Sequence, residues 1–285
     1  MQAGHTETDM ENVREICVAD SPERLRYSVC TLVTRPDEYG VMRDSFRDAG
    51  FTDDLCEFLY TDNSTQNQCD AFAAMNVFLQ EAAGEYIILC HQDIRLHDHT
   101  VTQLDTVITD LSQRAPNWGV IGNAGGIRPG HLAVRITDPK GTNTADGPFP
   151  AQVAAIDENF MLVRRSANLC LSGDLSGFHF YGTDLCIIAD ILGFSSWVVD
   201  FHLHHIGGAS TDKKGKSEFH TSYFDVRESL IRKYRRAFRS RWIQNTGTII
   251  YLTGSRLKQI VLNSKPAVRL CKLAGKIKRR LSQGG

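Results

Sequence analysis

The stretch that decides the fold is Ala71–Leu96, AFAAMNVFLQEAAGEYIILCHQDIRL. Its first half carries apolar residues at helical spacing and ends near Gly84, a residue typical of a helix C-cap. Its second half, Glu85–Cys90, is a short apolar run typical of a buried strand. This strand leads directly into His91-Gln92-Asp93. Side chains two residues apart on an extended chain point to the same side, so His91 and Asp93 are predicted to face one ligand together.

The same alternation of apolar and amphipathic segments continues on both sides of this stretch. It predicts strands at 27–34, 56–60, 118–121, 160–163 and 197–203, and helices at 38–48, 68–83, 101–113 and 184–192. Strands that alternate with helices of this length favour an α/β fold with a mostly parallel sheet, in which ligands gather at the carboxyl ends of the strands. The region between Arg128 and Pro150 contains three Gly and four Pro and is predicted to be a loop-rich insert.

The composition is that of a globular protein. Of 285 residues, 42% are hydrophobic and 23% are charged, which excludes disordered, collagen-like and coiled-coil classes. No apolar run reaches the roughly 18 residues of a membrane-spanning helix. The eight cysteines are scattered and form no CxxC pair, and the polar N-terminal residues lack the features of a signal peptide. We therefore expect free thiols and a cytoplasmic protein.

The formal net charge of −1 conceals a strong asymmetry along the chain. Residues 1–212 contain 13 Lys and Arg against 30 Asp and Glu, a balance of −17, whereas residues 213–285 contain 19 against 3, a balance of +16. Such asymmetry indicates a basic segment that meets an anionic surface. We predict a polar lead-in at 1–26, an acidic α/β domain at 27–212 and a basic, largely helical region at 213–285.

Several motifs occur in the order found in one enzyme family. The Asn76-bearing helix is followed by Ala82-Ala83-Gly84-Glu85-Tyr86, an apolar strand and His91-Gln92-Asp93. The later segments are ENFMLVRR at 158–165, FYGTDLC at 180–186 and HHIGGAS at 204–210. From about Tyr27 to Ser210 this set resembles the family 2 type of GT-A glycosyltransferases, where the sugar-nucleotide motif is D-x-D.

The resemblance implies a Rossmann-like GT-A domain that takes a sugar from a UDP-, GDP- or dTDP-sugar and passes it to a glycan or a lipid-linked acceptor. It also implies Mn²⁺ or Mg²⁺ at the donor diphosphate. The metal ligands would come from Asp93, His205, His204 and His91. The residues that would bind the donor are Thr34, Arg35, Asp62, Asn76, His91, Gln92 and Asp93.

The resemblance further implies an acidic residue that takes the proton of the acceptor hydroxyl, and an inverting reaction. Asp184 is the candidate base and Asp174 is its rival, because the usual Glu-Asp-x-Asp segment is reduced to Thr183-Asp184. A second departure is His91, which replaces the first acid of D-x-D and adds no negative charge. A catalytically inactive scaffold of the same fold is therefore a second hypothesis.

Several of these residues also have simpler structural explanations. Thr34 could cap the following helix, Asp62 could belong to a polar turn, and Asn76 is favoured as a structural hydrogen-bonding residue. Alternation along the strand puts His202 and His204 on one side and His205 on the other, and it does not decide which side faces the site; the family resemblance favours His205. A zinc centre made of these histidines is disfavoured because no nearby carboxylate completes a usual ligand set.

The basic region contains two amphipathic segments, 223–241 and 255–281, the second interrupted at Pro266. Apolar residues alternate with cations in both, which is typical of helices that lie in a headgroup layer. The alternative is a helix packed on the catalytic domain with its charges in solvent. We expect packing for 223–241 and an anionic membrane surface as the partner of Lys265–Arg280.

Two further function classes compete with the transferase. A nucleotidyltransferase of similar fold normally has a Gly-rich, basic loop after the first strand, and VTRPDEYG at 33–40 lacks it. A nucleic-acid-binding protein could use the basic region, but no recognisable nucleic-acid-reading motif accompanies the charge. We therefore expect no nucleic-acid partner.

Overall fold

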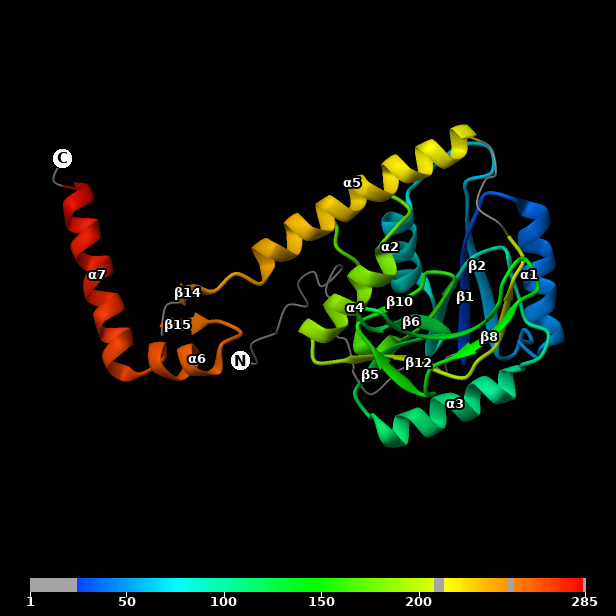
Figure 1. Cartoon of the computed structure of the whole chain (residues 1–285), viewed down its shortest axis with the longest axis horizontal. Helices are drawn as coiled ribbons and strands as arrows, with labels where there is room; N and C mark the ends of the chain where they lie inside the picture. The colour runs from blue at the N-terminus through cyan, green and yellow to red at the C-terminus, as the bar shows by residue number, and fades with distance from the viewer. Residues whose placement is uncertain (1–24, 208–212, 245–248, 284–285) are drawn as a thin grey trace, which may run out of the picture. The chain divides into compact units, whose positions relative to one another are not determined.

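The computed structural model describes residues 25–207, 213–244 and 249–283 (Figure 1). These residues divide into two compact units. The first contains 25–171 and 181–207, and the second contains 172–180 together with the described residues from 213 onward. Most of the predicted lead-in and the end of the HHIGGAS segment lie outside the described residues.

The first unit is built on a mixed seven-stranded sheet in which most strands run in one direction, as the alternation predicted. Its order is β2 (Cys56–Asp62), β1 (Tyr27–Val33), β3 (Tyr86–Cys90), β11 (Phe160–Arg164), β5 (Trp118–Gly122), β12 (Ser195–Val198) and β9 (Ala151–Val153). The β2–β1, β1–β3 and β5–β12 pairs are parallel, whereas β11 is antiparallel to both of its neighbours. The alternation of strands and helices predicted the parallel pairs but could not reveal that β11 enters the sheet in the opposite direction.

A second sheet replaces the loop-rich insert predicted between Arg128 and Pro150. Its order is β10 (Ala155–Ile156), β6 (Ala124–Arg128), β7 (His131–Thr137), β13 (Leu203–His205) and β4 (Ile94–Arg95), with β8 (Asn143–Asp146) on β7. The prediction of a loop was wrong because Pro129 and Gly130 form the tight turn between β6 and β7, with Gly130 at φ 75°. The single strand predicted at 197–203 is also divided, since β12 and β13 belong to different sheets.

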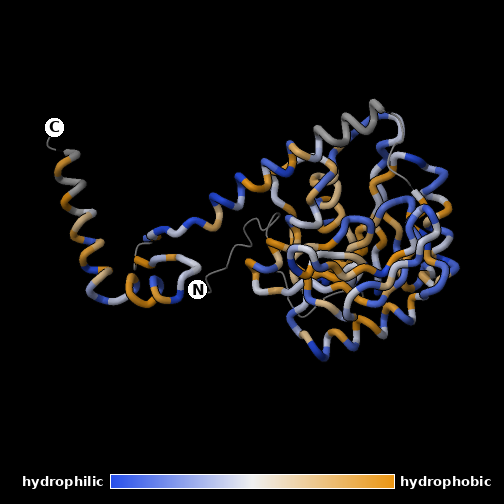
Figure 2. The backbone as a smooth tube through the Cα atoms, viewed as in Figure 1, coloured by the Kyte–Doolittle hydropathy of each residue, from blue (hydrophilic) through white to orange (hydrophobic). Residues whose placement is uncertain are grey.

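Four helices flank the sheets of this unit: α1 (Pro36–Asp48), α2 (Ala71–Glu81), α3 (Val101–Arg114) and α4 (Tyr181–Ile191). Local signals start three of them. α1 has Pro in its first turn, Asp70 accepts a hydrogen bond from Ala73 N at the start of α2, and Thr100 with Gln103 forms a capping box on α3. Figure 2 shows the alternation of apolar and polar residues along α3, whose apolar side is buried.

The apolar sides of α1 and α3 share one core with the main sheet. Phe46 and Leu104 from the helices are fully buried with Tyr27, Trp118 and Phe160 from the strands. The rings of Phe72 in α2 and Tyr181 in α4 pack edge to face, with centroids 6.4 Å apart. Each fully buried side chain of this size contributes about 1.5–3 kcal/mol through removal of apolar surface from water.

The second unit consists of α5 (Lys213–Ala237), β14 (Arg241–Gln244), β15 (Ile249–Leu252), α6 (Arg256–Leu262) and α7 (Lys265–Gln283), with 172–180. The predicted helix at 223–241 begins earlier and ends at Ala237. The second basic segment is divided into α6 and α7, and the break between them precedes Pro266. Pro266 lies in the first turn of α7, a position where a helix tolerates Pro. None of the helices in the described parts of the chain is long and apolar enough to cross a membrane.

Gly84 connects α2 to β3 at a point of very close backbone contact, and the C-cap of α2 is Ala82 rather than this glycine. A Cβ atom on Gly84 would lie 2.5 Å from the backbone carbon of Tyr27 and 2.6 Å from Ser28 N. Gly84 N donates to Ser28 Oγ at 2.8 Å, and its carbonyl accepts from Arg165 Nε at 2.7 Å. This connection therefore requires glycine for space.

We predict that Gly84→Ala lowers the free energy of unfolding by about 1–3 kcal/mol, because the added methyl group meets backbone that cannot rotate away. Denaturant unfolding followed by circular dichroism measures this. The matched control is Gly40→Ala inside α1, where nothing lies within 4 Å of the added Cβ. Gly40→Ala is expected to leave the free energy of unfolding unchanged or to raise it. Equal stability of the two variants would contradict the close-contact explanation.

Candidate functional site

The carboxyl end of β3 holds the central residues of the site. All five residues of β3 are buried, and the chain emerges from it at His91. Gln92 is 7% exposed, and its Oε1 accepts hydrogen bonds from the backbone N–H groups of Thr34 and Arg35, each at 2.9 Å. Its Nε2 donates to Thr34 Oγ1 at 2.8 Å. Gln92 thus fixes the end of β1 beside the end of β3, and Thr34 is engaged in this contact rather than in capping α1.

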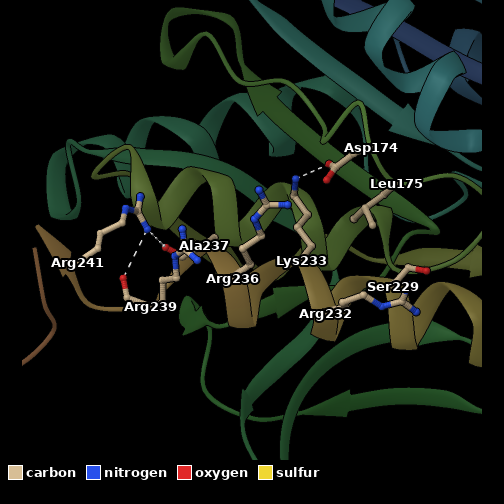
Figure 3. A pocket seen from close by; sticks show the side chains of 9 residues that line it. All are labelled: Asp174, Leu175, Ser229, Arg232, Lys233, Arg236, Ala237, Arg239 and Arg241. Carbon is tan, nitrogen blue, oxygen red and sulfur yellow. Dashed lines mark hydrogen bonds and ion pairs between the residues drawn. The ribbon is translucent and has the colours of Figure 1, made fainter. Parts of the chain in front are cut away.

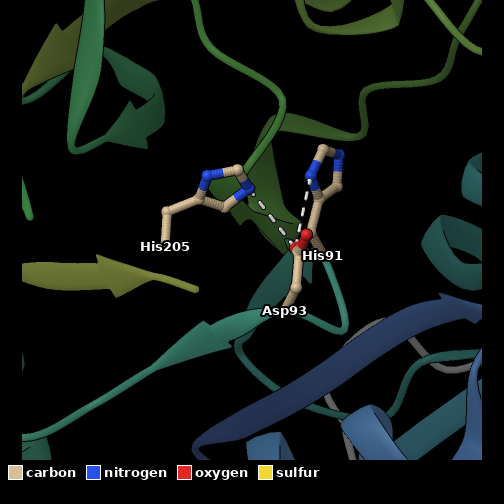
Figure 4. A group of neighbouring side chains, drawn as sticks. All are labelled: His91, Asp93 and His205. Carbon is tan, nitrogen blue, oxygen red and sulfur yellow. Dashed lines mark ion pairs between the residues drawn. The ribbon is translucent and has the colours of Figure 1, made fainter. Parts of the chain in front are cut away.

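Asp93 lies between two histidines from distant parts of the sequence (Figure 4). Its Oδ1 is 3.4 Å from His205 Nε2 and 4.0 Å from His91 Nδ1. His205 reaches this position because β13 pairs antiparallel with β4, which puts His205 opposite Ile94. One ligand atom from each of the three residues lies within 4.8 Å of the others. We call these three residues the Asp93 group.

One oxygen of the Asp93 carboxylate is buried and accepts no hydrogen bond. Oδ1 is inaccessible to solvent and has no hydrogen-bond partner, since His205 Nε2 at 3.4 Å supplies charge without a well-aligned hydrogen bond. Gly207 closes the other side of the carboxylate, where an added Cβ would overlap Asp93 Oδ2. Burying a carboxylate oxygen without a hydrogen-bond donor costs free energy unless a cation balances its negative charge. The Asp93 group therefore has a donor set suited to a divalent ion.

The environment of the Asp93 group favours a carboxylate and a neutral His91. Burial would raise the pKa of Asp93, but the contact and positive charge of His205 outweigh it and the pKa lies below its usual value. The contact with Asp93 raises the pKa of His205. Burial lowers the pKa of His91, although 42% of its side chain is accessible, and its Nε2 lies 3.0 Å from Tyr181 Oη. A neutral imidazole is the form that binds metals.

The other predicted donor-binding residues lie at the same edge of the sheet. Arg35 Nη2 is 2.8 Å from Glu38 Oε2 and 3.7 Å from Asp93 Oδ2. Asp62 ends β2 opposite Val33 of β1, where its Oδ1 accepts a hydrogen bond from Ser64 N at 2.8 Å. Asp62 is therefore part of a polar turn, and it is also exposed at the edge where β1 and β2 end.

Asn76 has a structural role in the first unit. Its Oδ1 accepts from Leu171 N at 2.7 Å and its Nδ2 donates to Leu171 O at 3.2 Å. Both ends of the amide are thus occupied by the backbone of one residue, 95 positions further along the chain. This agrees with the favoured explanation of Asn76 as a hydrogen-bonding residue that holds α2 to a later loop.

The two candidate bases lie in different units. Asp184 is in the first turn of α4 and is 0% exposed. Asp174 belongs to the second unit, where its carboxylate forms an ion pair with Lys233 Nζ, and this contact lowers the pKa of the carboxyl group. Asp174 borders a cavity of about 550 Å³ in that unit (Figure 3). The cationic residues that line it are Arg232, Lys233, Arg236, Arg239 and Arg241.

His204 does not belong to the Asp93 group. Adjacent residues of a strand point to opposite faces, so His204 faces away from His205. Its Nε2 lies 3.0 Å from Asp98 Oδ2, and His202 Nδ1 lies 2.7 Å from the same oxygen. The sequence left open which face of this strand carries the site, and the pairing of β13 with β4 decides that it is His205 that reaches Asp93.

Three residues near the Asp93 group were not predicted. Asp157 is exposed, and its negative charge acts on both His91 and His205. Tyr181 contacts His91, and Gly207 closes against Asp93. Asp157 lies here because β11 runs antiparallel to β3, so that Asn159 O accepts a hydrogen bond from His91 N at 3.0 Å. The strand pattern contained no signal for that direction; only the run Asp157-Glu158-Asn159 before an apolar strand marked the position.

Comparison with solved structures finds partial likenesses. TarS 1–349 of S. aureus in complex with UDP-GlcNAc matches with a TM-score of 0.45 at 11% identity, over 65% of this chain and 60% of that one. GalNAc-T7 with UDP, GalNAc and Mn²⁺ matches with a TM-score of 0.40 at 10% sequence identity, over 65% of this chain and 44% of that one. A197 from STIV matches with a TM-score of 0.40 at 8% sequence identity, over 65% of this chain and 87% of that one.

Comparison with known sequences gives a more direct result. No family model matches the chain. The protein named ATP synthase subunits region ORF 6 of Fuscovulum blasticum is 39% identical over 223 residues, which cover 76% of this chain and 86% of that protein. At this identity and coverage, the chain belongs to the same family as the ORF 6 protein of the Fuscovulum blasticum ATP synthase subunits region.

Proposed function

We propose that this protein is a glycosyltransferase that takes a sugar from a nucleotide-diphospho-sugar and transfers it to a glycan or lipid-linked acceptor. The observation that carries the proposal is the Asp93 group. A buried carboxylate oxygen without a partner faces two imidazoles at the carboxyl end of a central strand. Ligands of α/β sheets bind at such strand ends. This position is also the one where the motif resemblance puts the donor diphosphate.

The surrounding residues fit a donor with a base, a ribose and a diphosphate. Thr34 and Arg35 follow β1 and are held in place by Gln92, and Asp62 is the last residue of the neighbouring strand β2. The Arg35 guanidinium is about half exposed and lies near Asp93, where it would pair with a phosphate oxygen. The Asp62 carboxylate would accept a hydrogen bond from the nucleotide. UDP-, GDP- and dTDP-sugars all have these groups.

The residues of the Asp93 group would hold the divalent ion. Mg²⁺ prefers oxygen ligands, whereas imidazole nitrogen suits transition metals, so the two histidines favour Mn²⁺ over Mg²⁺. When bound, such an ion acts as a Lewis acid that stabilises the negative charge on the departing diphosphate. Gly207 packs against the Asp93 carboxylate without a side chain that would displace it, and Tyr181 contacts the His91 ring, so both residues would keep the ligand atoms in place.

In the proposed reaction the acceptor hydroxyl oxygen bonds to the anomeric carbon while the bond from that carbon to the diphosphate breaks. The electron pair leaves with the nucleoside diphosphate, and a carboxylate takes the hydroxyl proton. Attack from the face opposite the diphosphate inverts the anomeric centre. A positioned base of this kind typically contributes about 10²–10⁴-fold in rate.

The motif resemblance assigns the base to Asp184, with Asp174 as its rival. Asp184 is fully buried, so it would reach an acceptor only after a change at the start of α4. Asp157 is exposed, and its charge acts on two members of the Asp93 group. We therefore add Asp157 as the base candidate that is accessible without rearrangement.

The second unit would bind an anionic membrane surface, which brings a lipid-linked acceptor within reach. Apolar side chains recur every three or four residues along α7 and remain exposed: Leu270 is 67%, Leu273 55%, Ile277 51% and Leu281 76% exposed. Figure 2 shows apolar and polar stretches alternating along α7. Seven Lys and Arg residues lie in the same 19-residue helix. Exposed apolar residues flanked by cations fit the boundary between headgroups and acyl chains.

We predict that Asp93→Asn weakens donor binding in Mn²⁺ by at least about tenfold, because the variant loses a charged ligand. Calorimetry with UDP-, GDP- and dTDP-sugars, in Mn²⁺ and then in EDTA, measures the effect. Gly207→Ala is expected to have the same consequence, since its methyl group would displace the Asp93 carboxylate.

The matched controls for that experiment are Asp190→Asn, at an exposed position of α4, and Gly126→Ala, where nothing lies within 4 Å of the added Cβ. Both should bind the donor as the unmodified protein does. If the unmodified protein binds no nucleotide-sugar in the presence of Mn²⁺, the transferase proposal is wrong. If it binds the donor but neither hydrolyses nor transfers the sugar, the inactive scaffold is the better description.

A second prediction concerns the base. Asp157→Asn is expected to lower turnover by about 10²–10⁴-fold while the dissociation constant of the donor is unchanged. Donor hydrolysis or transfer, measured together with calorimetric binding, separates the two effects. If Asp184→Asn, and not Asp157→Asn, lowers turnover without changing the dissociation constant of the donor, the base lies in α4. The start of that helix must then change conformation during the reaction. Full turnover of both variants moves the assignment to Asp174.

A third prediction concerns α7. Replacing Leu270, Leu273 and Ile277 by Ser should release the protein from vesicles that contain anionic lipid, because the apolar contact is lost while every charge remains. Flotation on vesicles with and without anionic lipid is the measurement. A matched control replaces the half-buried Val268 alone by Ala. Unchanged flotation of the triple variant contradicts membrane binding through α7, and tight binding to duplex DNA instead would favour a nucleic-acid partner.

A further inference from the structure

A second group of metal-ligating side chains lies on the other side of β13 from the Asp93 group. β13 pairs antiparallel with β4, with His204 opposite Arg95, so the residues after β4 face those at the start of β13. This brings Asp98, in the loop between β4 and α3, to His202 and His204. We propose that Asp98, His202 and His204 bind a Zn²⁺ ion that is separate from the ion at Asp93. We call these three residues the Asp98 group.

The distances within the Asp98 group suit one ion. Asp98 Oδ2 is 2.7 Å from His202 Nδ1 and 3.0 Å from His204 Nε2. One ligand atom from each residue lies within 4.8 Å of the others. Zn²⁺ binds nitrogen and carboxylate oxygen at about 2.0–2.2 Å in tetrahedral geometry, which requires ligand atoms roughly 3.4 Å apart. Small rotations of the exposed Asp98 side chain provide this spacing.

His202 has the surroundings of a metal-binding histidine. It is 1% exposed, and the contact of its buried Nδ1 is with Asp98 Oδ2 at 2.7 Å. Its other nitrogen, Nε2, lies 2.8 Å from Thr137 Oγ1 in β7. Histidines that bind metals are usually oriented in this way by a partner on the second nitrogen. The ring is therefore fixed by Thr137 with Nδ1 facing Asp98.

Two more histidines surround the Asp98 group and have different roles. His99 Nδ1 accepts a hydrogen bond from His202 N at 2.9 Å, so it holds the backbone of the group. The His97 ring is exposed and its centroid lies 4.8 Å from that of His204. Among the described residues the His97 side chain forms no hydrogen bond, so its imidazole is available as a fourth ligand. With His97, the group becomes three imidazoles and one carboxylate.

The donor set selects the class of metal. Two or three imidazole nitrogens with a single carboxylate suit Zn²⁺, whereas Mg²⁺ and Ca²⁺ prefer sets made of oxygen. The ion would connect the loop that begins α3 to the strand that carries His205. Because a site assembled from residues about 100 positions apart exists only in the folded chain, bound Zn²⁺ would stabilise that chain.

The experiment uses the full chain, stripped of metal with a chelator and then titrated with ZnCl₂. The background is Asp93→Asn, so that zinc at the Asp93 group does not contribute. We expect one equivalent of Zn²⁺ by calorimetry and elemental analysis, and a rise in the midpoint of thermal unfolding of about 5 °C or more at saturating zinc.

Adding Asp98→Asn or His204→Gln to this background should weaken zinc binding by at least about tenfold and remove most of the thermal shift. Both side chains are partly exposed, so their replacement leaves the core intact. The matched control is His131→Gln, a histidine of β7 outside both groups, which should bind zinc normally. His97→Ala should weaken binding less than His204→Gln does.

Three results would overturn the proposal: no zinc bound in the Asp93→Asn background, zinc bound equally by the Asp98→Asn variant, or binding lost equally in the His131→Gln control. None of these depends on nucleotide-sugar binding. Failure of the transferase proposal would therefore leave the Asp98 group standing, and its failure would leave the Asp93 group unaffected.

Discussion

The antiparallel pairing of β13 with β4 is the contact on which both His-Asp groups depend. It puts His205 opposite Ile94 and His204 opposite Arg95, and the backbone continues the contact with Ile206 N donating to Asp93 O at 2.8 Å. Because neighbouring residues of a strand point to opposite faces, His205 reaches Asp93 while His204 reaches Asp98. A shift of one residue in this register would exchange the two histidines and take the imidazole away from each carboxylate.

The second constraint on the structure is electrostatic and concerns the buried Asp93 carboxylate after the end of β3. Burying the carboxylate of Asp93 is costly, and the site offsets that cost with the charge of His205 and the nearby Arg35 guanidinium rather than with hydrogen bonds to both oxygens. The amide of Gln92 holds Thr34 and Arg35, so the residue between His91 and Asp93 fixes the end of β1 beside the end of β3. Rigid placement of this kind is what a binding site for a charged ligand requires.

Much of the first unit could be predicted because its signals are local. The apolar run before His91, the Pro that starts α1 and the capping box of α3 each act within a few residues. The second sheet could not be predicted, since its Gly and Pro residues mark turns as readily as they mark loops. The direction of β11 was also unpredictable, and with it the position of Asp157, because strand direction depends on pairing between residues about 70 positions apart.

The sequence by itself determined that His91, Gln92 and Asp93 stand at the end of a buried strand, and that the chain has an acidic part followed by a basic one. Only the tertiary structure decided which histidine joins Asp93, that Asn76 holds the backbone of Leu171, and that Asp98 completes a second group with His202 and His204. The physical reason is that periodicity gives the face of a strand on which a side chain lies, whereas its partner depends on strand register and on loops that no local pattern specifies.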